Sequence, residues 1–232
     1  MIFFMLRAVI FDCDGIIVNS EPHHLSAFQQ VLSGVGITLS REDYYKKYLA
    51  MDDEGCFGAV FRDRGRTLQK EILRDLIAKK KVIYEELASK ELILYPGVVD
   101  LVRRLKGRYR LAVASGALLS EVRFALEKGG IAAEFPIVIT AEAVKNGKPH
   151  PESFLEALKG LNRTSPLPDP PIRPDEALVI EDSLHGVDGA KAAGMLCLAV
   201  SNSYPKDQLT RADHVVETLE GIGLEELEGL FT

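Results

Sequence analysis

The stretch Leu6-Arg7-Ala8-Val9-Ile10-Phe11-Asp12-Cys13-Asp14-Gly15 decides the fold, because an apolar run ends there in two aspartates. A nearly continuous apolar run is typical of a parallel strand that is buried on both faces. In an open parallel sheet, ligands bind beyond the carboxyl ends of the strands. Asp12 and Asp14, followed by a glycine that lets the chain turn, therefore predict a functional site. An acidic pair in a solvated loop is the plainer alternative.

The rest of the chain alternates between strand and helix signals. Short apolar runs at 111–114, 137–139, 177–180 and 196–200 predict strands. Segments with helical spacing lie between them, at 98–106, 118–128, 152–161 and 184–193. Gly129-Gly130 and Gly194 follow two of these segments and favour a helix end there. This alternation predicts an α/β fold with a doubly wound parallel sheet as its core.

One region breaks the alternation and predicts an inserted all-helical domain. From about residue 22 to 94 there is no convincing strand signal, and 71–77 and 82–88 carry apolar residues at helical spacing. A stretch of this length is too long for a loop. We therefore expect an all-helical cap domain over 19–94, inserted into an α/β core formed by 1–18 and 95–232. The segment 162–175 holds five prolines and predicts a stiff surface connection, with a ligand for a proline-recognition domain as the alternative.

Composition argues against several classes of partner. The 232 residues are 47% hydrophobic with a formal net charge of −6, so a nucleic-acid partner is not expected. No apolar run approaches the ~20 residues of a membrane span. The three cysteines are odd in number and lack metal-ligand spacing, which favours reduced thiols in a cytoplasmic protein. We expect a monomer, because no large apolar stripe is left over.

Polar residues follow further strands of the predicted sheet. Ser115 and Gly116 end the run at 111–114, Lys148 lies in the loop after 137–139, and Glu181-Asp182 ends the run at 177–180. Each has an ordinary explanation: a helix N-cap, a solvated loop cation and a capped helix start. With Asp12 and Asp14, polar residues follow four strands at one edge of the sheet. Four such coincidences are much less expected than one, so together they predict an active site.

The charges of these residues imply a cation. Asp12, Glu181 and Asp182 together with a phosphate dianion exceed the charge of Lys148 by four negative charges, even with Asp14 protonated. One pair of unit charges about 4 Å apart is worth about 4 kcal/mol at an effective dielectric constant near 20. Such a site would repel a phosphorylated substrate. A few oxygen ligands beside a phosphate favour Mg²⁺ over Zn²⁺.

These motifs resemble a known family. Asp12-Cys13-Asp14-Gly15, Ser115, Lys148-Pro149 and Glu181-Asp182-Ser183 resemble, in order and spacing, the four motifs of the haloacid dehalogenase superfamily. The helical insertion is similar to that family's cap, and the resemblance covers essentially the whole chain. The nearest subgroup includes phosphoglycolate phosphatase, β-phosphoglucomutase and small sugar-phosphate phosphatases.

The resemblance implies a role for each site residue. Asp12 would be the nucleophile that forms an aspartyl-phosphate, and Asp14 the general acid–base. Mg²⁺ would be held by the Asp12 carboxylate, the Asp14 backbone carbonyl and Asp182, with Glu181 a direct or water-mediated ligand. Ser115, Gly116 and Lys148 would bind the phosphoryl group. His24 falls where the mutase has a histidine near the active site and is included on that ground, although a packing or surface role is the plainer interpretation.

The residues that depart from the family's patterns favour a phosphatase over a mutase. An aspartate at position 14 marks phosphatases and phosphotransferases in this superfamily, so dehalogenation is not expected. Gly116-Ala117-Leu118-Leu119 lacks the polar pair that grips a sugar phosphate in the mutase, and Asp52-Asp53-Glu54 is acidic where the mutase has an arginine. We expect Mg²⁺-dependent hydrolysis of a small phosphorylated metabolite, such as a sugar phosphate or phosphoglycolate. The alternatives are a β-phosphoglucomutase-like phosphotransferase and, remotely, a receiver-like phospho-signalling module.

Overall fold

The computed structural model describes residues 5–49 and 51–231 and divides the chain into two compact units. One unit consists of Met1–Asn19 with Ile93–Thr232, and the other is Ser20–Leu92. The second unit starts one residue later and ends two residues earlier than the domain expected over 19–94. Each unit has its own apolar core and is described separately below.

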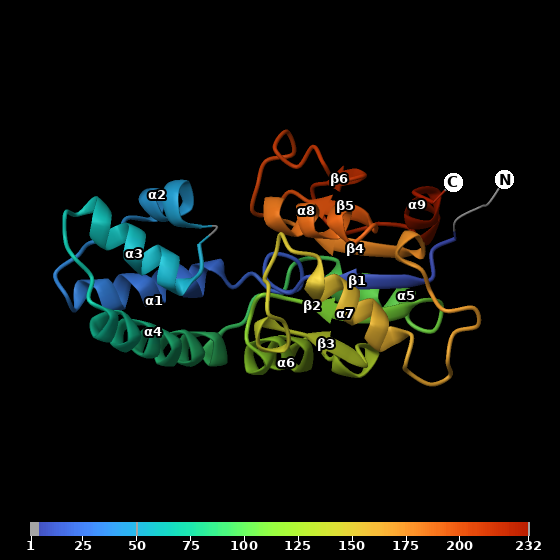
Figure 1. Ribbon diagram of the computed structural model, residues 1–232, viewed down its shortest axis with the longest axis horizontal. Helices are drawn as coiled ribbons and strands as arrows, with labels where there is room; N and C mark the ends of the chain where they lie inside the picture. The colour runs from blue at the N-terminus through green and yellow to red at the C-terminus, as the bar shows by residue number, and fades with distance from the viewer. Residues whose placement is uncertain (1–4, 50, 232) are drawn as a thin grey trace. The chain divides into compact units, whose positions relative to one another are not determined.

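The larger unit is built on a parallel sheet with the strand order β3-β2-β1-β4-β5-β6 (Figure 1). Its strands are β1 (Ala8–Phe11), β2 (Arg110–Ala114), β3 (Ile137–Ile139), β4 (Ala177–Glu181), β5 (Leu196–Val200) and β6 (His214–Val216). Its α-helices are α5 (Val98–Leu105), α6 (Leu119–Lys128), α7 (Glu152–Leu161), α8 (Leu184–Ala192) and α9 (Leu224–Gly229). Short helical turns η2 (Ala132–Glu134), η3 (Ala141–Ala143) and η4 (Pro174–Glu176) lie between them.

Helices cover both faces of this sheet, as a doubly wound fold requires. The buried residues Ile10 and Val179 pack with Phe154 of α7 and Val187 of α8 in one apolar cluster. Figure 1 shows α7 and α8 in front of the sheet and α5 behind it. All four residues of β1 are fully buried, as expected for a strand covered on both faces. The α/β class and the doubly wound sheet predicted from the sequence are confirmed.

The regular secondary structure in the described residues of the smaller unit is all helical. It contains α1 (Glu21–Ser33), α2 (Arg41–Asp43), the π-helical turn η1 (Tyr44–Tyr48), α3 (Asp53–Asp63) and α4 (Lys70–Lys90). Its core gathers aromatic side chains, with the rings of Phe28 and Phe57 in an edge-to-face contact at 5.0 Å. The two periodic segments at 71–77 and 82–88 belong to one helix, α4.

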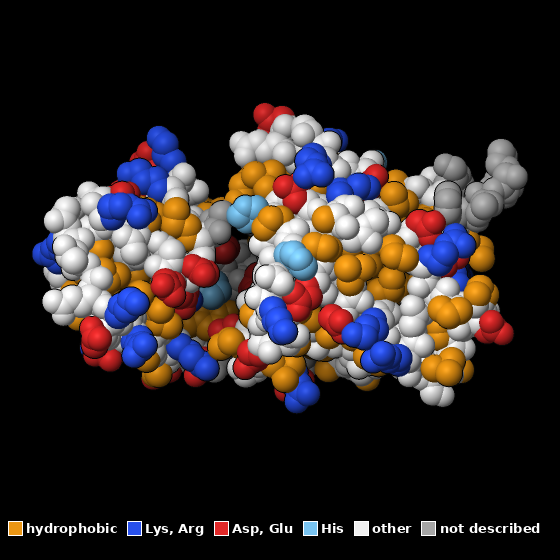
Figure 2. All heavy atoms as spheres, viewed as in Figure 1, with side chains coloured by type: hydrophobic (Ala, Val, Ile, Leu, Met, Phe, Trp, Pro, Cys, Tyr) orange, Lys and Arg blue, Asp and Glu red, His pale blue; other side chains and the backbone are white. Residues whose placement is uncertain are grey.

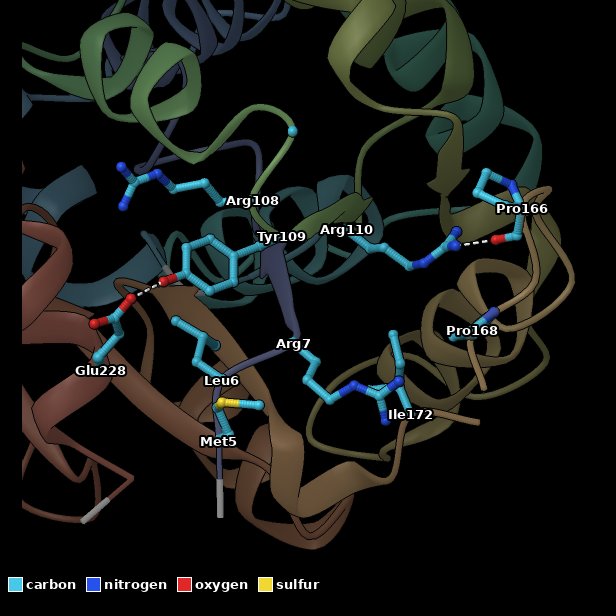
Figure 3. Close-up of a pocket in the computed structure, with 11 residues that line it drawn as sticks. Met5, Leu6, Arg7, Arg108, Tyr109, Arg110, Pro166, Pro168, Ile172 and Glu228 are labelled. Carbon is cyan, nitrogen blue, oxygen red and sulfur yellow. Dashed lines mark hydrogen bonds between the residues drawn. The ribbon is translucent and has the colours of Figure 1, made fainter. Parts of the chain in front are cut away.

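The proline-rich connection between α7 and β4 is held by two arginines at the amino ends of the strands. Arg110 donates to the carbonyl oxygens of Thr164, at 3.1 Å, and of Pro166. Arg7 donates to the carbonyl oxygen of Pro170 at 2.8 Å. Both arginines line an open cavity of about 1130 Å³ at this end of the unit, shown in Figure 3. Hydrogen bonds from these two arginines to backbone carbonyl oxygens therefore fix the connection.

On the face that Figure 2 shows, acidic and basic side chains are interspersed over both units. None of the helices in the described part of the chain combines the length and apolar character that a membrane crossing needs. Cys13, Cys56 and Cys197 are buried and free.

Candidate active site

The pairing of β1 with β4 brings three of the predicted site residues together. Phe11 pairs with Ile180, and the Asp12 amide donates to the Ile180 carbonyl oxygen at 2.9 Å. Asp12 and the Glu181-Asp182 pair therefore leave neighbouring parallel strands at the same level. All three carboxylates are buried, with Asp12 7%, Glu181 0% and Asp182 3% exposed.

Lys148 bridges the ends of these two strands. Its Nζ lies 2.6 Å from Asp12 Oδ1 and 2.6 Å from Glu181 Oε1. The Phe154 ring lies 5.0 Å from the same Nζ and covers it. Burial lowers the pKa of Lys148, but the carboxylates of Asp12 and Glu181 outweigh it and raise the pKa above its usual value. Lys148 is therefore a fixed cation between the two acidic side chains.

The second oxygen of Glu181 is saturated by the start of α8. Oε2 accepts from the Asp182 and Ser183 amides, both at 2.8 Å, and from the Ser183 hydroxyl at 2.9 Å. The Ser183 hydroxyl also caps α8 by accepting from the Gly186 amide at 3.0 Å. A Cβ at Gly186 would lie 1.7 Å from Glu181 Oε1, so only glycine allows the helix to approach this carboxylate.

Asp182 points instead toward the turn after β1. A Cβ at Gly15 would lie 1.9 Å from Asp182 Oδ2, and Gly15 has a φ of +82°. Glycine is the residue that adopts this backbone conformation without steric cost. The turn that carries Asp14 is therefore packed directly against the Asp182 carboxylate.

The buried carboxylates are poorly compensated by protein groups alone. Burial raises the pKa of Asp12 to about 7, with Lys148 opposing the rise and Glu181 adding to it. Burial also raises the pKa of Asp182, and the carboxylates of Glu181 and Asp12 raise it further. Both shifts have the same cause: ionised oxygens are held close together away from water.

The donor set fits a hard divalent cation. One carboxylate oxygen from each of Asp12, Glu181 and Asp182 lies within 4.8 Å of the others. Three buried carboxylates face the single cation Lys148, among the residues that the structure describes. Oxygen donors without sulfur or imidazole suit Mg²⁺ and similar ions.

Ser115 and Gly116 follow β2, the neighbour of β1 on its other side. The Ser115 amide donates to the Ile139 carbonyl oxygen at 2.9 Å, and its hydroxyl accepts from the Ala117 amide at 3.0 Å. Ser115 is not the N-cap of α6, which begins after Leu118. Gly116 is exposed, and a Cβ there would meet no atom within 4 Å. Both residues leave the carboxyl edge of the sheet, and their binding roles stay predictions.

His24 lies in the helical unit, in a partly buried polar cluster. The buried Lys80 Nζ lies 2.7 Å from His24 Nδ1 and 2.7 Å from Asp53 Oδ1. The His24 ring stacks on Tyr84 at 4.2 Å between ring centroids. Burial and the charge of Lys80 hold the pKa of His24 well below its usual range, so the ring is neutral at pH 7. The proposed contact of His24 with phosphate stays a prediction.

Sequence reasoning missed two residues after β5. Asn202 Nδ2 donates to the Gly15 carbonyl oxygen at 2.7 Å, and the Ser203 hydroxyl donates to Asp182 Oδ2. The signal was present, because both residues follow the apolar run at 196–200 at the same edge of the sheet. Only the loop conformation shows which of its polar side chains reach the site.

Comparison with protein-family models identifies the class of this protein. A family model described as haloacid dehalogenase-like hydrolase matches residues 6–194. A match over most of the chain shows that this protein belongs to that family. This membership overturns the remote alternative of a receiver-like signalling module.

Individual relatives in this class include a phosphatase and a phosphoglucomutase. The chain is 28% identical over 196 residues to the phosphorylated carbohydrates phosphatase of Thermotoga maritima, with 82% of each chain covered. The crystal structure of CbbY from Rhodobacter sphaeroides in complex with phosphate matches with a TM-score of 0.81 and 25% identity, over 96% of this chain and 99% of that one. β-Phosphoglucomutase from Clostridium difficile shares the fold, with a TM-score of 0.81 and 24% identity over 98% and 97% of the two chains. The protein is a haloacid dehalogenase-like hydrolase, and its curated relatives include a phosphatase.

Proposed function

We propose that this protein is a Mg²⁺-dependent phosphatase that hydrolyses a small phosphorylated metabolite through an aspartyl-phosphate on Asp12. The observation that carries the proposal is the Asp12–Lys148–Glu181 bridge beside Asp182, buried at the carboxyl edge of the sheet. A phosphorylated carbohydrate is the favoured substrate class, because the Thermotoga maritima relative is named for it.

In the first half-reaction, a carboxylate oxygen of Asp12 attacks phosphorus, and the bond between phosphorus and the leaving oxygen breaks. Asp14 donates a proton to that leaving oxygen, so the product departs as a neutral alcohol. Lys148 and the donors after β2, Ser115 and Gly116, neutralise and orient the phosphoryl oxygens. Asp12 then carries the phosphoryl group as an acyl phosphate, a mixed anhydride of the carboxyl and phosphate groups.

In the second half-reaction, Asp14 takes a proton from a water molecule whose oxygen attacks the same phosphorus. The bond to Asp12 breaks, and the products are free phosphate and the original carboxylate. Lys148 stays beside Asp12 throughout, because Glu181 holds it from the other side.

Asp12, Asp182 and the Asp14 backbone carbonyl would hold the cation, with Glu181 binding directly or through water. When bound, Mg²⁺ offsets the charge of the carboxylates and of the phosphoryl oxygens. The fit rests on the surplus of buried oxygen donors over the one lysine.

A β-phosphoglucomutase-like phosphotransferase is the alternative, and the residues after Ser115 argue against it. The segment Gly116-Ala117-Leu118-Leu119 offers no polar side chain for a sugar phosphate. The mutase and this protein share a fold, which many activities can use. Isomerisation of a hexose phosphate without release of phosphate would establish the mutase.

Hydrolysis of a generic aryl phosphate tests the proposal. We expect turnover that requires Mg²⁺, is abolished by EDTA and is lost in Asp12→Asn. Asp207→Asn, at an exposed position, is the matched control and should keep full activity. If Asp12→Asn hydrolysed the ester at the wild-type rate, the proposed nucleophile would be wrong. If the aryl phosphate is hydrolysed as expected, rates on a panel of phosphorylated carbohydrates would identify the preferred substrate.

A further inference from the structure

Ser203 lies in the loop after β5 and contacts the acidic cluster directly. Its hydroxyl donates to Asp182 Oδ2. Asp182 is 3% exposed, so this hydrogen bond is largely screened from water. A hydrogen bond to a buried carboxylate is stronger than one between neutral groups.

The same carboxylate oxygen is confined from a second side. Asp182 Oδ2 lies so near the Gly15 backbone that a Cβ there would be 1.9 Å away. With Ser203 donating to Oδ2 and Gly15 packed against it, the carboxylate cannot rotate without losing a hydrogen bond. Oδ1 also lies near Gly15, but among the described residues it accepts no hydrogen bond, so it is the oxygen that a cation would bind.

The neighbouring residue ties the same loop to the turn after β1. Asn202 Nδ2 donates to the Gly15 carbonyl oxygen at 2.7 Å. The loop therefore fixes Asp182 through Ser203 and the turn that follows Asp14 through Asn202. Both contacts come from neutral side chains, which orient the acidic groups without replacing the positive charge of a bound ion.

We propose that Ser203 is a positioning residue for the metal site, which holds the Asp182 carboxylate in the orientation that binds Mg²⁺. The inference rests on the proposed function for the identity of the ion. It adds a residue outside the four motifs, from a loop that sequence reasoning left unassigned. Groups that orient a metal ligand typically change metal affinity or activity by about 10- to 100-fold when removed.

Calorimetric titration of the metal-free protein with Mg²⁺ tests this role without using activity. We expect Ser203→Ala to weaken Mg²⁺ binding by about 10-fold or more. Ser203→Thr keeps the hydroxyl and should restore most of the affinity. Ser201→Ala, on the same loop, is the matched control and should bind as the wild type does. The melting temperature of each variant in EDTA shows whether it is folded.

The outcomes separate this inference from the proposed function. If Ser203→Ala binds Mg²⁺ within about twofold of the wild type, or if Ser203→Thr fails to restore binding to a folded protein, the positioning role is wrong. Wild-type hydrolysis of the aryl phosphate would still support the proposed function in either case. If Ser203→Ala weakens binding and the wild type hydrolyses no phosphate ester, the positioning role stands and the proposed function fails. Absence of Mg²⁺ binding by the wild type would overturn the inference.

Discussion

Replacing Asp12 with asparagine should stabilise the metal-free protein at neutral and alkaline pH. Burial raises the pKa of Asp12 from 3.8 to about 7, so ionising this carboxyl opposes folding. The shift is about three pKa units, and each unit corresponds to about 1.4 kcal/mol. The ceiling on the stabilisation is therefore about 4 kcal/mol, reached where the wild-type carboxyl is ionised.

The expected gain is smaller than this ceiling, because the substitution also changes the partners of Lys148. The amide oxygen of asparagine still accepts from Lys148 Nζ, but the lysine keeps only one carboxylate, Glu181, of the two that it now bridges. We expect a net gain of about 1 to 2 kcal/mol. For a chain of this size that corresponds to a rise in melting temperature of about 2 to 8 °C.

The stability advantage of Asp12→Asn over the wild type should depend on pH. A carboxyl whose folded pKa lies above its unfolded value costs stability as the pH rises between the two values. The advantage of Asp12→Asn should therefore be absent near pH 4, grow up to about pH 7 and stay constant above it. Thermal unfolding in EDTA measures it at each pH, with Asp207→Asn as a control that removes an exposed charge.

Magnesium should reduce or reverse the difference in melting temperature between Asp12→Asn and the wild type. Binding to the folded wild type stabilises it by mass action, and Asp12→Asn loses one of the proposed ligands. The gap in melting temperature should then narrow or change sign at about pH 8. The reasoning is refuted if the variant melts at or below the wild type in EDTA at pH 8, or if the gap does not vary with pH.

Three further substitutions test other contacts. Lys148→Met should lower kcat by about 100-fold or more, because it removes the fixed cation that would meet the phosphoryl oxygens; a loss under threefold in a steady-state assay would contradict that role. Gly15→Ala should destabilise the protein more than Gly107→Ala does, by at least about 2 kcal/mol in the free energy of unfolding. Both glycines have a positive φ, but only at Gly15 would the added Cβ meet Asp182. Equal denaturation midpoints for the two variants would contradict this prediction. Arg110→Ala should speed cleavage within 162–175 in limited proteolysis, and an unchanged rate would show that its carbonyl contacts do not hold the connection.

The strands β1, β2, β4 and β5 were predictable from sequence because they are buried almost throughout. The run at 196–200 coincides with β5, and the helical spacing at 152–161 coincides with α7. The strand β6 was missed because His214-Val215-Val216 holds only two apolar residues, whereas the equally short and half-buried β3 is apolar throughout. Burial on both faces is what makes apolar continuity informative.

The helix α4 shows where periodicity misleads. Two apolar segments were found because the sequence between them, Ala78-Lys79-Lys80-Lys81, looks polar. The chain is helical through it, and Lys80 is only 4% exposed. A lysine that pairs with Asp53 and His24 in a core cannot be distinguished by composition from one in water. Its partners come from two other helices, so only the tertiary structure identifies it.

Their positions at the ends of strands predict that Asp12, Glu181 and Asp182 lie at one edge of the sheet. Position alone does not predict the separate roles of the adjacent residues Glu181 and Asp182. Successive side chains of an extended chain point in opposite directions. Glu181 accordingly faces Lys148 and the start of α8, while Asp182 faces Gly15 and Ser203.

Hydrogen-bonding capacity separates the two acids further. The oxygens of Glu181 accept from Lys148, from two backbone amides and from a hydroxyl. The Asp182 carboxylate has one such bond, from Ser203, among the described residues. A cation that bound Glu181 directly would have to share an oxygen with these donors, whereas Asp182 Oδ1 needs no such exchange. Of the two acids, we therefore expect Asp182 to bind the ion directly and Glu181 to keep Lys148 in place.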